Sequence, residues 1–164
     1  MRQSSLKCNP LAAHPARAYT GTMGDNLVAI ASMRVDASRD DVWRALTDPA
    51  LIAEYYFGTR VETDWQRGSP ITWSGEFEGT EYVDHGTILE AVPLERLVHT
   101  HFSPLSGRED VPENYHTLTW TLTPEGGATT VTLAQDNNHS YDEVEHSEKN
   151  WHQVLEGLKQ VVES

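Results

Sequence analysis

The sequence contains a single cysteine, Cys8, among its 164 residues. One thiol cannot form an intramolecular disulfide, so folding does not depend on oxidation and we expect a cytoplasmic protein. No apolar run is long enough for a transmembrane helix. The stretch that follows Lys7 is too short and too polar for the hydrophobic region of a signal peptide. These absences predict a protein that has no membrane partner.

Basic residues are also scarce, with 12 Lys and Arg against 25 Asp and Glu, for a formal net charge of -13. No basic cluster interrupts this acidity, and DNA or an anionic membrane would be repelled. We therefore expect no nucleic-acid partner. Aromatic residues are plentiful, with 5 Trp, 6 Tyr and 3 Phe, which indicates a folded chain with a substantial core.

The first part of the chain differs in composition from the remainder. Residues 1–24 hold no acid before Asp25, and prolines and glycines interrupt any periodic pattern. We expect a flexible N-terminal tail over 1–24 and one domain over 25–164. The sequence leaves open whether residues 1–22 belong to the native protein, because Met23 is an alternative start.

The domain follows a pattern of strands bracketed by helices. Ser38 is an N-cap candidate for a first short helix, Pro49 starts a second one through Tyr55, and an amphipathic helix covers 142–163. Alternation and turn residues predict strands at 27–35, 71–77, 81–92, 97–102, 115–123 and 129–135. This order predicts an α+β fold with an antiparallel sheet.

Several local strings carry a resemblance to a known family. They are DASRDDVWRALTDP at 36–49, YFG at 56–58, GTILE at 86–90 and WHQVLEGL at 151–158. In this order they resemble the AHSA-type branch, related to activators of a heat-shock chaperone ATPase, of the START-like (SRPBCC) superfamily. The resemblance spans about residues 27–163. It implies a helix-grip (START/Bet v-like) fold, in which a curved antiparallel sheet wraps around a long C-terminal helix, with two short helices after the first strand. Many members bind hydrophobic ligands and a few are enzymes.

Strand alternation predicts which side chains face the interior. The row of Thr117, Thr119 and Thr121 is typical of a solvent face, so His116 and Trp120 point inward. His99 and His101 share the face of Leu97, so they point inward if Leu97 packs in the core. Apolar walls with few polar groups are typical of a ligand site. The predicted ligand-binding residues are Tyr56, Phe57, Trp73, Phe77, His99, His101, His116, Trp120, Gln135, Trp151 and Leu155.

The spacing of His99 and His101, with His116 on a neighbouring strand, has a metal-site interpretation. Three imidazoles are a zinc ligand set. No carboxylate or cysteine with ligand spacing accompanies them, so we predict neither a metal nor a cofactor. Catalytic residues stay unassigned, because the sequence has no Gly-x-Ser-x-Gly elbow and no glycine-rich phosphate loop.

Three functions compete. The first is non-enzymatic binding or sequestration of a small, largely apolar or aromatic molecule in a cavity between the sheet and the C-terminal helix. The second is a cyclase- or hydrolase-like enzyme that uses cavity histidines for acid–base chemistry. The third is a chaperone partner, which the family resemblance alone implies. The sequence identifies neither the ligand nor the oligomeric state, and a homodimer stays open.

Overall fold

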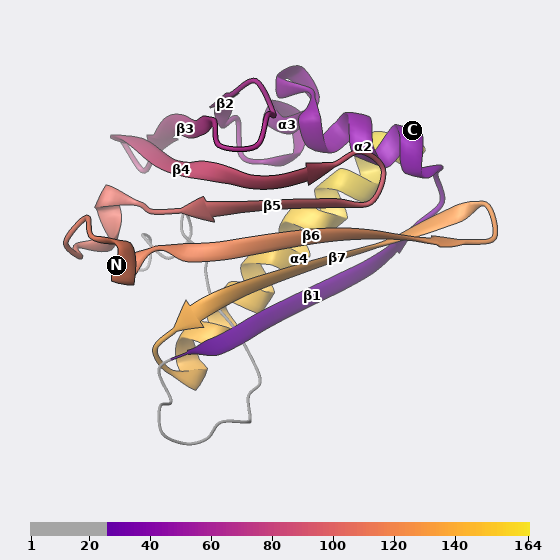
Figure 1. Ribbon diagram of the computed structural model, residues 1–164. Helices are drawn as coiled ribbons and strands as arrows, with labels where there is room; N and C mark the ends of the chain where they lie inside the picture. The colour runs from indigo at the N-terminus through magenta and orange to yellow at the C-terminus, as the bar shows by residue number, and fades with distance from the viewer. Residues whose placement is uncertain (1–25) are drawn as a thin grey trace.

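The computed structural model describes residues 26–164 (Figure 1). The predicted tail over 1–24 lies outside the described residues, so the domain boundary stays a prediction. The elements, in chain order, are β1 (Leu27–Val35), α2 (Arg39–Thr47), α3 (Pro49–Tyr55), β2 (Arg60–Glu62), β3 (Pro70–Phe77), β4 (Thr80–Val92), β5 (Arg96–His101), η2 (Pro104–Ser106), η3 (Pro112–Asn114), β6 (His116–Glu125), β7 (Ala128–Asn138) and α4 (Tyr141–Glu163).

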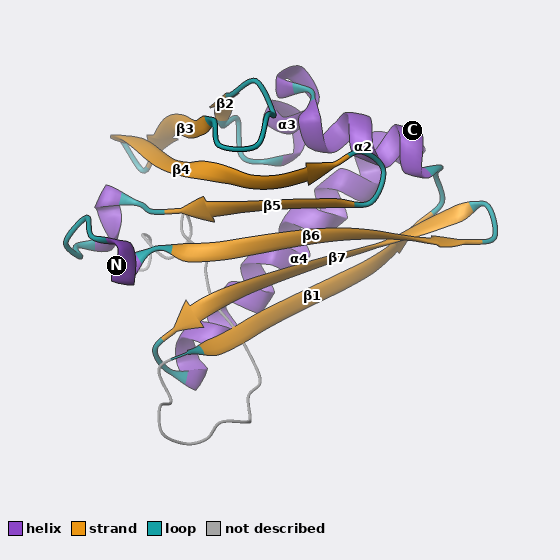
Figure 2. Cartoon of the chain, viewed as in Figure 1, coloured by secondary structure: helices purple, strands orange, loops and turns teal. Residues whose placement is uncertain are grey.

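The strands form one curved sheet in the order β1-β7-β6-β5-β4-β3-β2, and every neighbouring pair is antiparallel. Helix α4 lies across one face of this sheet, and α2 and α3 lie near the C-terminal end of α4 (Figure 2). The predicted α+β helix-grip fold, with two short helices after the first strand, is confirmed.

Side-chain caps determine where the helices begin. Ser38 Oγ accepts a hydrogen bond from the Asp41 amide at 3.2 Å, and Ser140 Oγ accepts one from the Glu143 amide at 3.1 Å. Asp48 ends α2 and also caps α3, because its carboxylate accepts from the Ala50 amide at 3.0 Å. Each cap satisfies an amide that the first helical turn would otherwise leave without a partner.

The core lies between the sheet and the apolar face of α4. Trp151, Leu155 and Leu158 of α4 are buried against Trp120 of β6 and Leu133 of β7. The rings of Trp120 and Trp151 meet edge to face with their centroids 6.0 Å apart. These large side chains fill the centre of the sheet–helix layer, so a ligand cavity must lie toward one end of it.

The structure differs from the sequence-based expectation at three places. The strand β2 has only three residues, too few for a recognisable alternation. The segment between β5 and β6, for which no helix or strand was predicted, contains the short helices η2 and η3. Strand β6 continues through Pro124 to Glu125, whereas the predicted strand ends at residue 123. Beyond Thr121 β6 no longer pairs with β5, so the missing N–H of Pro124 breaks no ladder bond there.

Candidate functional site

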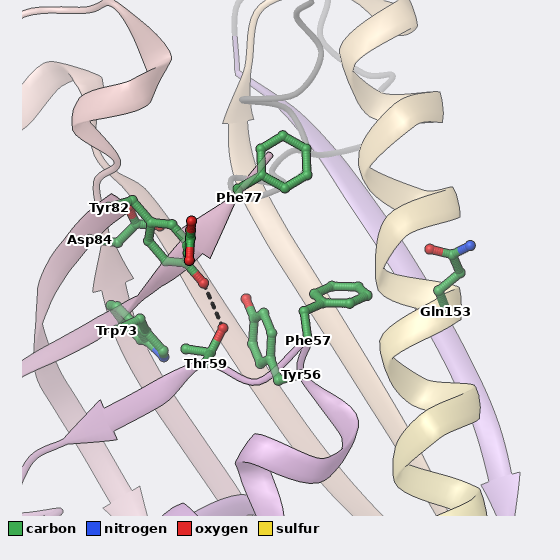
Figure 3. Close-up of a pocket in the computed structure, with 9 residues that line it drawn as sticks. Tyr56, Phe57, Thr59, Trp73, Phe77, Tyr82, Asp84 and Gln153 are labelled. Atoms are coloured by element: carbon green, nitrogen blue, oxygen red, sulfur yellow. Dashed lines mark hydrogen bonds between the residues drawn. The ribbon is translucent and has the colours of Figure 1, made fainter. Parts of the chain in front are cut away.

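A cavity of about 140 Å³ lies between the β3–β4 hairpin, the segment after α3 and helix α4 (Figure 3). Aromatic side chains dominate its walls, and two carboxylates, an amide and a threonine complete them. The lining residues are Tyr56, Phe57, Thr59, Trp73, Glu76, Phe77, Tyr82, Asp84 and Gln153.

The β3–β4 register builds one wall of this cavity. Trp73, Gly75 and Phe77 lie on the same face of β3. Gly75 is paired with Tyr82 of β4. A Cβ atom on Gly75 would lie 2.8 Å from the Tyr82 hydroxyl oxygen, so the missing side chain leaves room for the tyrosine. The Tyr82 and Thr59 hydroxyls share a hydrogen bond of 2.7 Å, which holds the ring across the hairpin (Figure 3).

The end of α3 forms the mouth of the cavity. Phe57 and Gly58 both have a positive φ, 55° and 75°, which turns the chain sharply toward β2. The Phe57 side chain is 58% exposed and meets Tyr56 edge to face at 5.8 Å. Tyr56 also contacts Trp151 of α4, with centroids 5.9 Å apart. Phe57 therefore lies at the rim, and Tyr56 connects the cavity to the core.

A buried polar pair lies beside the aromatic wall. Oδ2 of Asp84 is 3.0 Å from Nε2 of His101, and both residues are nearly inaccessible, at 2% and 3% exposed. The ring of Trp73 packs against His101 at 5.0 Å. Among the residues that the structure describes, Oδ1 of Asp84 has no hydrogen-bond partner. A buried carboxylate oxygen without a partner is costly, and Asp84 lines the cavity, so a positive charge in the cavity would stabilise this carboxylate.

His99 lies behind the Trp73 wall, with ring centroids 5.1 Å apart. Its Nε2 accepts a hydrogen bond from the indole N–H of Trp120 at 3.2 Å, and Nδ1 lies 3.1 Å from the carbonyl oxygen of Thr100. These partners define a neutral imidazole with its proton on Nδ1. Burial lowers the pKa of His99 to about 4, which agrees with that assignment. A space of about 30 Å³ beside His99 and Trp120 is water-sized and too small for an organic ligand.

Comparison with known proteins assigns the family. Residues 36–163 match the family model described as "Activator of Hsp90 ATPase homolog 1-like protein". The chain belongs to this family. No curated protein sequence matches it.

Solved structures of similar proteins support the fold of this AHSA1-like protein. ChR145 from Cytophaga hutchinsonii is 47% identical, with a TM-score of 0.74 over 84% of this chain and 94% of that chain. CV1439 from Chromobacterium violaceum is 23% identical, with a TM-score of 0.70 over 84% and 97% of the two chains. DynU16, a protein of the dynemicin biosynthetic locus, is 22% identical, with a TM-score of 0.69 over 84% of this chain and 47% of that chain. The last two likenesses concern the fold alone.

The predicted ligand-binding residues separate into three groups in this AHSA1-like protein. Tyr56, Phe57, Trp73 and Phe77 line the cavity. His99, His101, Trp120 and Trp151 are buried behind its walls, in contact with Trp73 or Tyr56 or with one another. The third group does not line the cavity and comprises His116, Gln135 and Leu155.

The third group makes contacts elsewhere in the core. His116 Nδ1 lies 2.8 Å from the carbonyl oxygen of Asp136, and desolvation lowers the pKa of His116 to about 3. Gln135 accepts a hydrogen bond from the indole N–H of Trp151, and Leu155 is fully buried. The inward direction predicted for these side chains is observed, but they do not border the cavity, and Trp120 and Trp151 fill the centre of the sheet–helix layer.

Five lining residues were not predicted from the sequence, namely Thr59, Glu76, Tyr82, Asp84 and Gln153. The sequence did contain a pattern for two of them. Tyr82 and Asp84 are two residues apart on β4 and therefore share one face, as Trp73 and Phe77 share one face of β3. The register that places Asp84 opposite Trp73 could not be read from either strand alone.

Other features of the described residues do not form a comparable site. Within 26–164, no group of three or more His, Cys, Asp or Glu side chains could hold a metal ion, and no helix is long and apolar enough to cross a membrane. A wider groove of about 850 Å³ lies between β1 and α4, but eight of its ten lining residues are polar or charged and none is Phe, Tyr or Trp. An apolar ligand fits the smaller cavity better.

Proposed function

We propose that this AHSA1-like protein binds a small, largely apolar molecule in the cavity below the β3–β4 hairpin, without transforming it. The observation that carries the proposal is an enclosure of about 140 Å³ with five aromatic side chains in its walls. Cavities of about 150 Å³ in other proteins bind benzene. The bound group therefore has about the size of one ring. The aromatic residues are Tyr56, Phe57, Trp73, Phe77 and Tyr82.

The surroundings of the histidines favour binding over catalysis. His99 and His116 are hydrogen-bonded to the protein and do not line the cavity. The nine lining residues include no histidine, cysteine or lysine. A general acid or base must come within hydrogen-bond reach of the substrate, and these imidazoles are separated from the cavity by its walls.

A second candidate, an acid–base enzyme, is favoured by the Asp84–His101 pair. His101 positions Asp84, whose second oxygen has no partner in the described part of the chain. A carboxylate held in this way could accept a proton from a bound molecule. Turnover of an aryl ester that disappears in Asp84→Asn, while the variant still binds benzyl alcohol, would favour this candidate.

We also propose a location and a partner for the protein. The proposed location is the cytoplasm, because the sequence contains one cysteine, Cys8, and therefore no intramolecular disulfide. The partner proposed is a small hydrophobic or aromatic ligand, and a homodimer stays open. A chaperone-partner role stays the weaker alternative, because only the family's description supports it.

An NMR titration tests the binding proposal. We expect benzyl alcohol, which has one ring, to shift the indole N–H of Trp73 and the amides of Gly75 and Tyr82. The amides of Thr119 and Thr121 on β6, a strand that contributes no residue to the cavity lining, should not move. Equal shifts at the hairpin and at β6, or no shift with either benzyl alcohol or the larger naphthalen-2-ol, would contradict a specific cavity site.

A pair of variants on the same hairpin sharpens the test. A Cβ on Gly75 would displace the Tyr82 ring, which lines the cavity, so Gly75→Ala should weaken binding of benzyl alcohol several-fold. Val83 is 55% exposed on β4 and does not line the cavity, so Val83→Ala is the matched control. If Gly75→Ala and Val83→Ala bind benzyl alcohol with equal affinity, the ligand does not bind in this cavity.

A further inference from the structure

The cavity combines aromatic walls with negative charge, and this combination identifies a ligand class. We propose that the cavity selects an organic ammonium ion, with the cationic group held among the aromatic side chains and beside the carboxylate of Asp84. The inference rests on the proposed function, since it names the chemistry of the molecule that the same cavity binds.

The aromatic side chains come from three separate elements and approach the cavity from different directions. Tyr56 and Phe57 follow α3, Trp73 and Phe77 belong to β3, and Tyr82 belongs to β4 (Figure 3). The face of an aromatic ring carries negative electrostatic potential, which attracts a cation within about 6 Å of the ring centroid. Several rings around one enclosure are the arrangement with which proteins recognise alkylated ammonium groups.

The charges of the lining residues favour the same ligand. Asp84 and Glu76 are the charged side chains in the lining, and the lining contains no lysine or arginine. Asp84 is 2% exposed, and within the described residues its Oδ1 has no hydrogen-bond partner. Nε2 of His101 lies 3.0 Å from Oδ2 of Asp84, and no group in the described residues pairs with Oδ1. A cation in the cavity would add an electrostatic attraction to this carboxylate that a neutral molecule of the same shape lacks. The net charge of -13 also raises the local concentration of cations around the protein.

The size of the cavity agrees with one ammonium group. About 140 Å³ accommodates a trimethylammonium head but no long apolar chain. The mouth at Phe57, whose side chain is 58% exposed, leaves a path for a substituent to extend into solvent. The ligand would therefore have a compact cationic end inside the cavity and its remainder outside.

The direct test compares a cation with its neutral isostere on the wild-type protein. Choline and 3,3-dimethylbutan-1-ol have the same shape, and only choline is charged. We expect choline to bind about three- to thirtyfold more tightly at constant ionic strength, measured by the shift of the Trp73 indole N–H. Equal affinities, or tighter binding of the alcohol, would overturn the ammonium inference and leave the binding proposal intact.

Benzyl alcohol, measured in the same way, shows whether the ammonium inference fails alone or together with the proposed function. If neither choline nor its isostere shifts the cavity resonances while benzyl alcohol does, the ammonium inference alone is wrong. If none of the three shifts them, the proposed function fails as well.

Variants test the role of Asp84. Asp84→Asn keeps the size of the side chain and a hydrogen-bonding atom toward His101, and it should lower the affinity for choline about tenfold with little effect on the alcohol. Glu95→Gln changes the net charge equally at an exposed position outside the cavity lining and is the matched control. An unchanged preference for choline in a folded Asp84→Asn protein would remove Asp84 from the site. If Asp84→Asn does not fold, Glu76→Gln at the rim should still weaken choline binding more than Glu95→Gln.

Discussion

The indole N–H of Trp120 donates a hydrogen bond of 3.2 Å to Nε2 of His99, in the interior between β5 and β6. This bond requires an unprotonated Nε2, so the imidazole is neutral in the folded protein. The neighbouring His101 adds to the effect, since a second imidazole disfavours a positive charge on His99. The pair is therefore a buried polar contact whose stability depends on pH.

Acidification should destabilise the protein partly through His99. Its pKa falls from the ordinary value of 6.5 to about 4 in the folded state, so below pH 6.5 the unfolded chain binds a proton that the folded chain excludes. The stabilisation that neutral His99 contributes to the free energy of unfolding is complete above pH 6.5, and it is lost progressively as the pH falls toward 4. Urea unfolding at pH 7 and pH 5 measures the decrease.

The variant His99→Gln isolates this contribution, because glutamine can accept from Trp120 and does not titrate. We expect the unfolding free energy of the variant to fall less between pH 7 and pH 5 than that of the wild type. An identical decrease would show that other groups account for the acid sensitivity.

Truncation of Trp151 should destabilise the domain severely. This side chain is 2% exposed, donates to Gln135 and contacts the rings of Tyr56 and Trp120. Loss of a buried tryptophan costs roughly 3–5 kcal/mol, and Gln135 would lose its partner as well. His152→Ala, at the next and exposed position, should stay within about 0.5 kcal/mol of the wild type in urea unfolding. A cost below about 1 kcal/mol for Trp151→Ala would contradict its position in the core.

The fold could be predicted from the sequence because its signals are local and periodic. Ser38 caps α2, Pro49 begins α3, and the spacing of Trp151, Leu155 and Leu158 defines the buried face of α4. Alternation also gave the correct interior face for His99 and Trp120. Each of these inferences depends on neighbours within one element, where the period of the backbone determines the direction of a side chain.

The site was less predictable because it depends on distances between elements. Alternation could not show that Trp120 and Trp151 meet and fill the centre of the layer. The position of Asp84 in the cavity depends on the β3–β4 register, and the contact between Tyr82 and Thr59 depends on a bend after α3. Sequence patterns report a facing direction, whereas a cavity is the volume that facing side chains leave unfilled.

Two glycines near the site should respond differently to the same substitution. A Cβ on Gly86 would lie 1.9 Å from the backbone oxygen of Thr100, whereas a Cβ on Gly75 would meet the end of the Tyr82 side chain at 2.8 Å. A strand backbone cannot move away as a side chain can, so Gly86→Ala should lose several kcal/mol of stability or fail to fold. Gly75→Ala should fold and lose roughly 1–3 kcal/mol. Thermal unfolding of both variants gives the comparison, and equal losses would contradict the close approach at Gly86.

Two substitutions of the rim residue Phe57 test the effect of its backbone conformation on stability separately from the effect of its ring on ligand binding. It holds a φ of 55°, a left-handed conformation that is unfavourable for any residue with a Cβ, while its side chain is 58% exposed. Phe57→Gly removes the ring and relieves the backbone, and Phe57→Ala removes the ring alone. The glycine variant should therefore be more stable than the alanine variant by about 1 kcal/mol, the reverse of the usual order in regular structure.

Binding of benzyl alcohol should weaken to a similar extent in both Phe57 variants, because both lose the ring that lies at the mouth of the cavity. Urea unfolding measures the stability difference, and the Trp73 indole shift measures the affinity. A more stable alanine variant would show that residue 57 does not hold the left-handed conformation in solution. Unchanged affinity in both variants would place the ligand deeper, against Trp73 and Asp84, with no contribution from the rim.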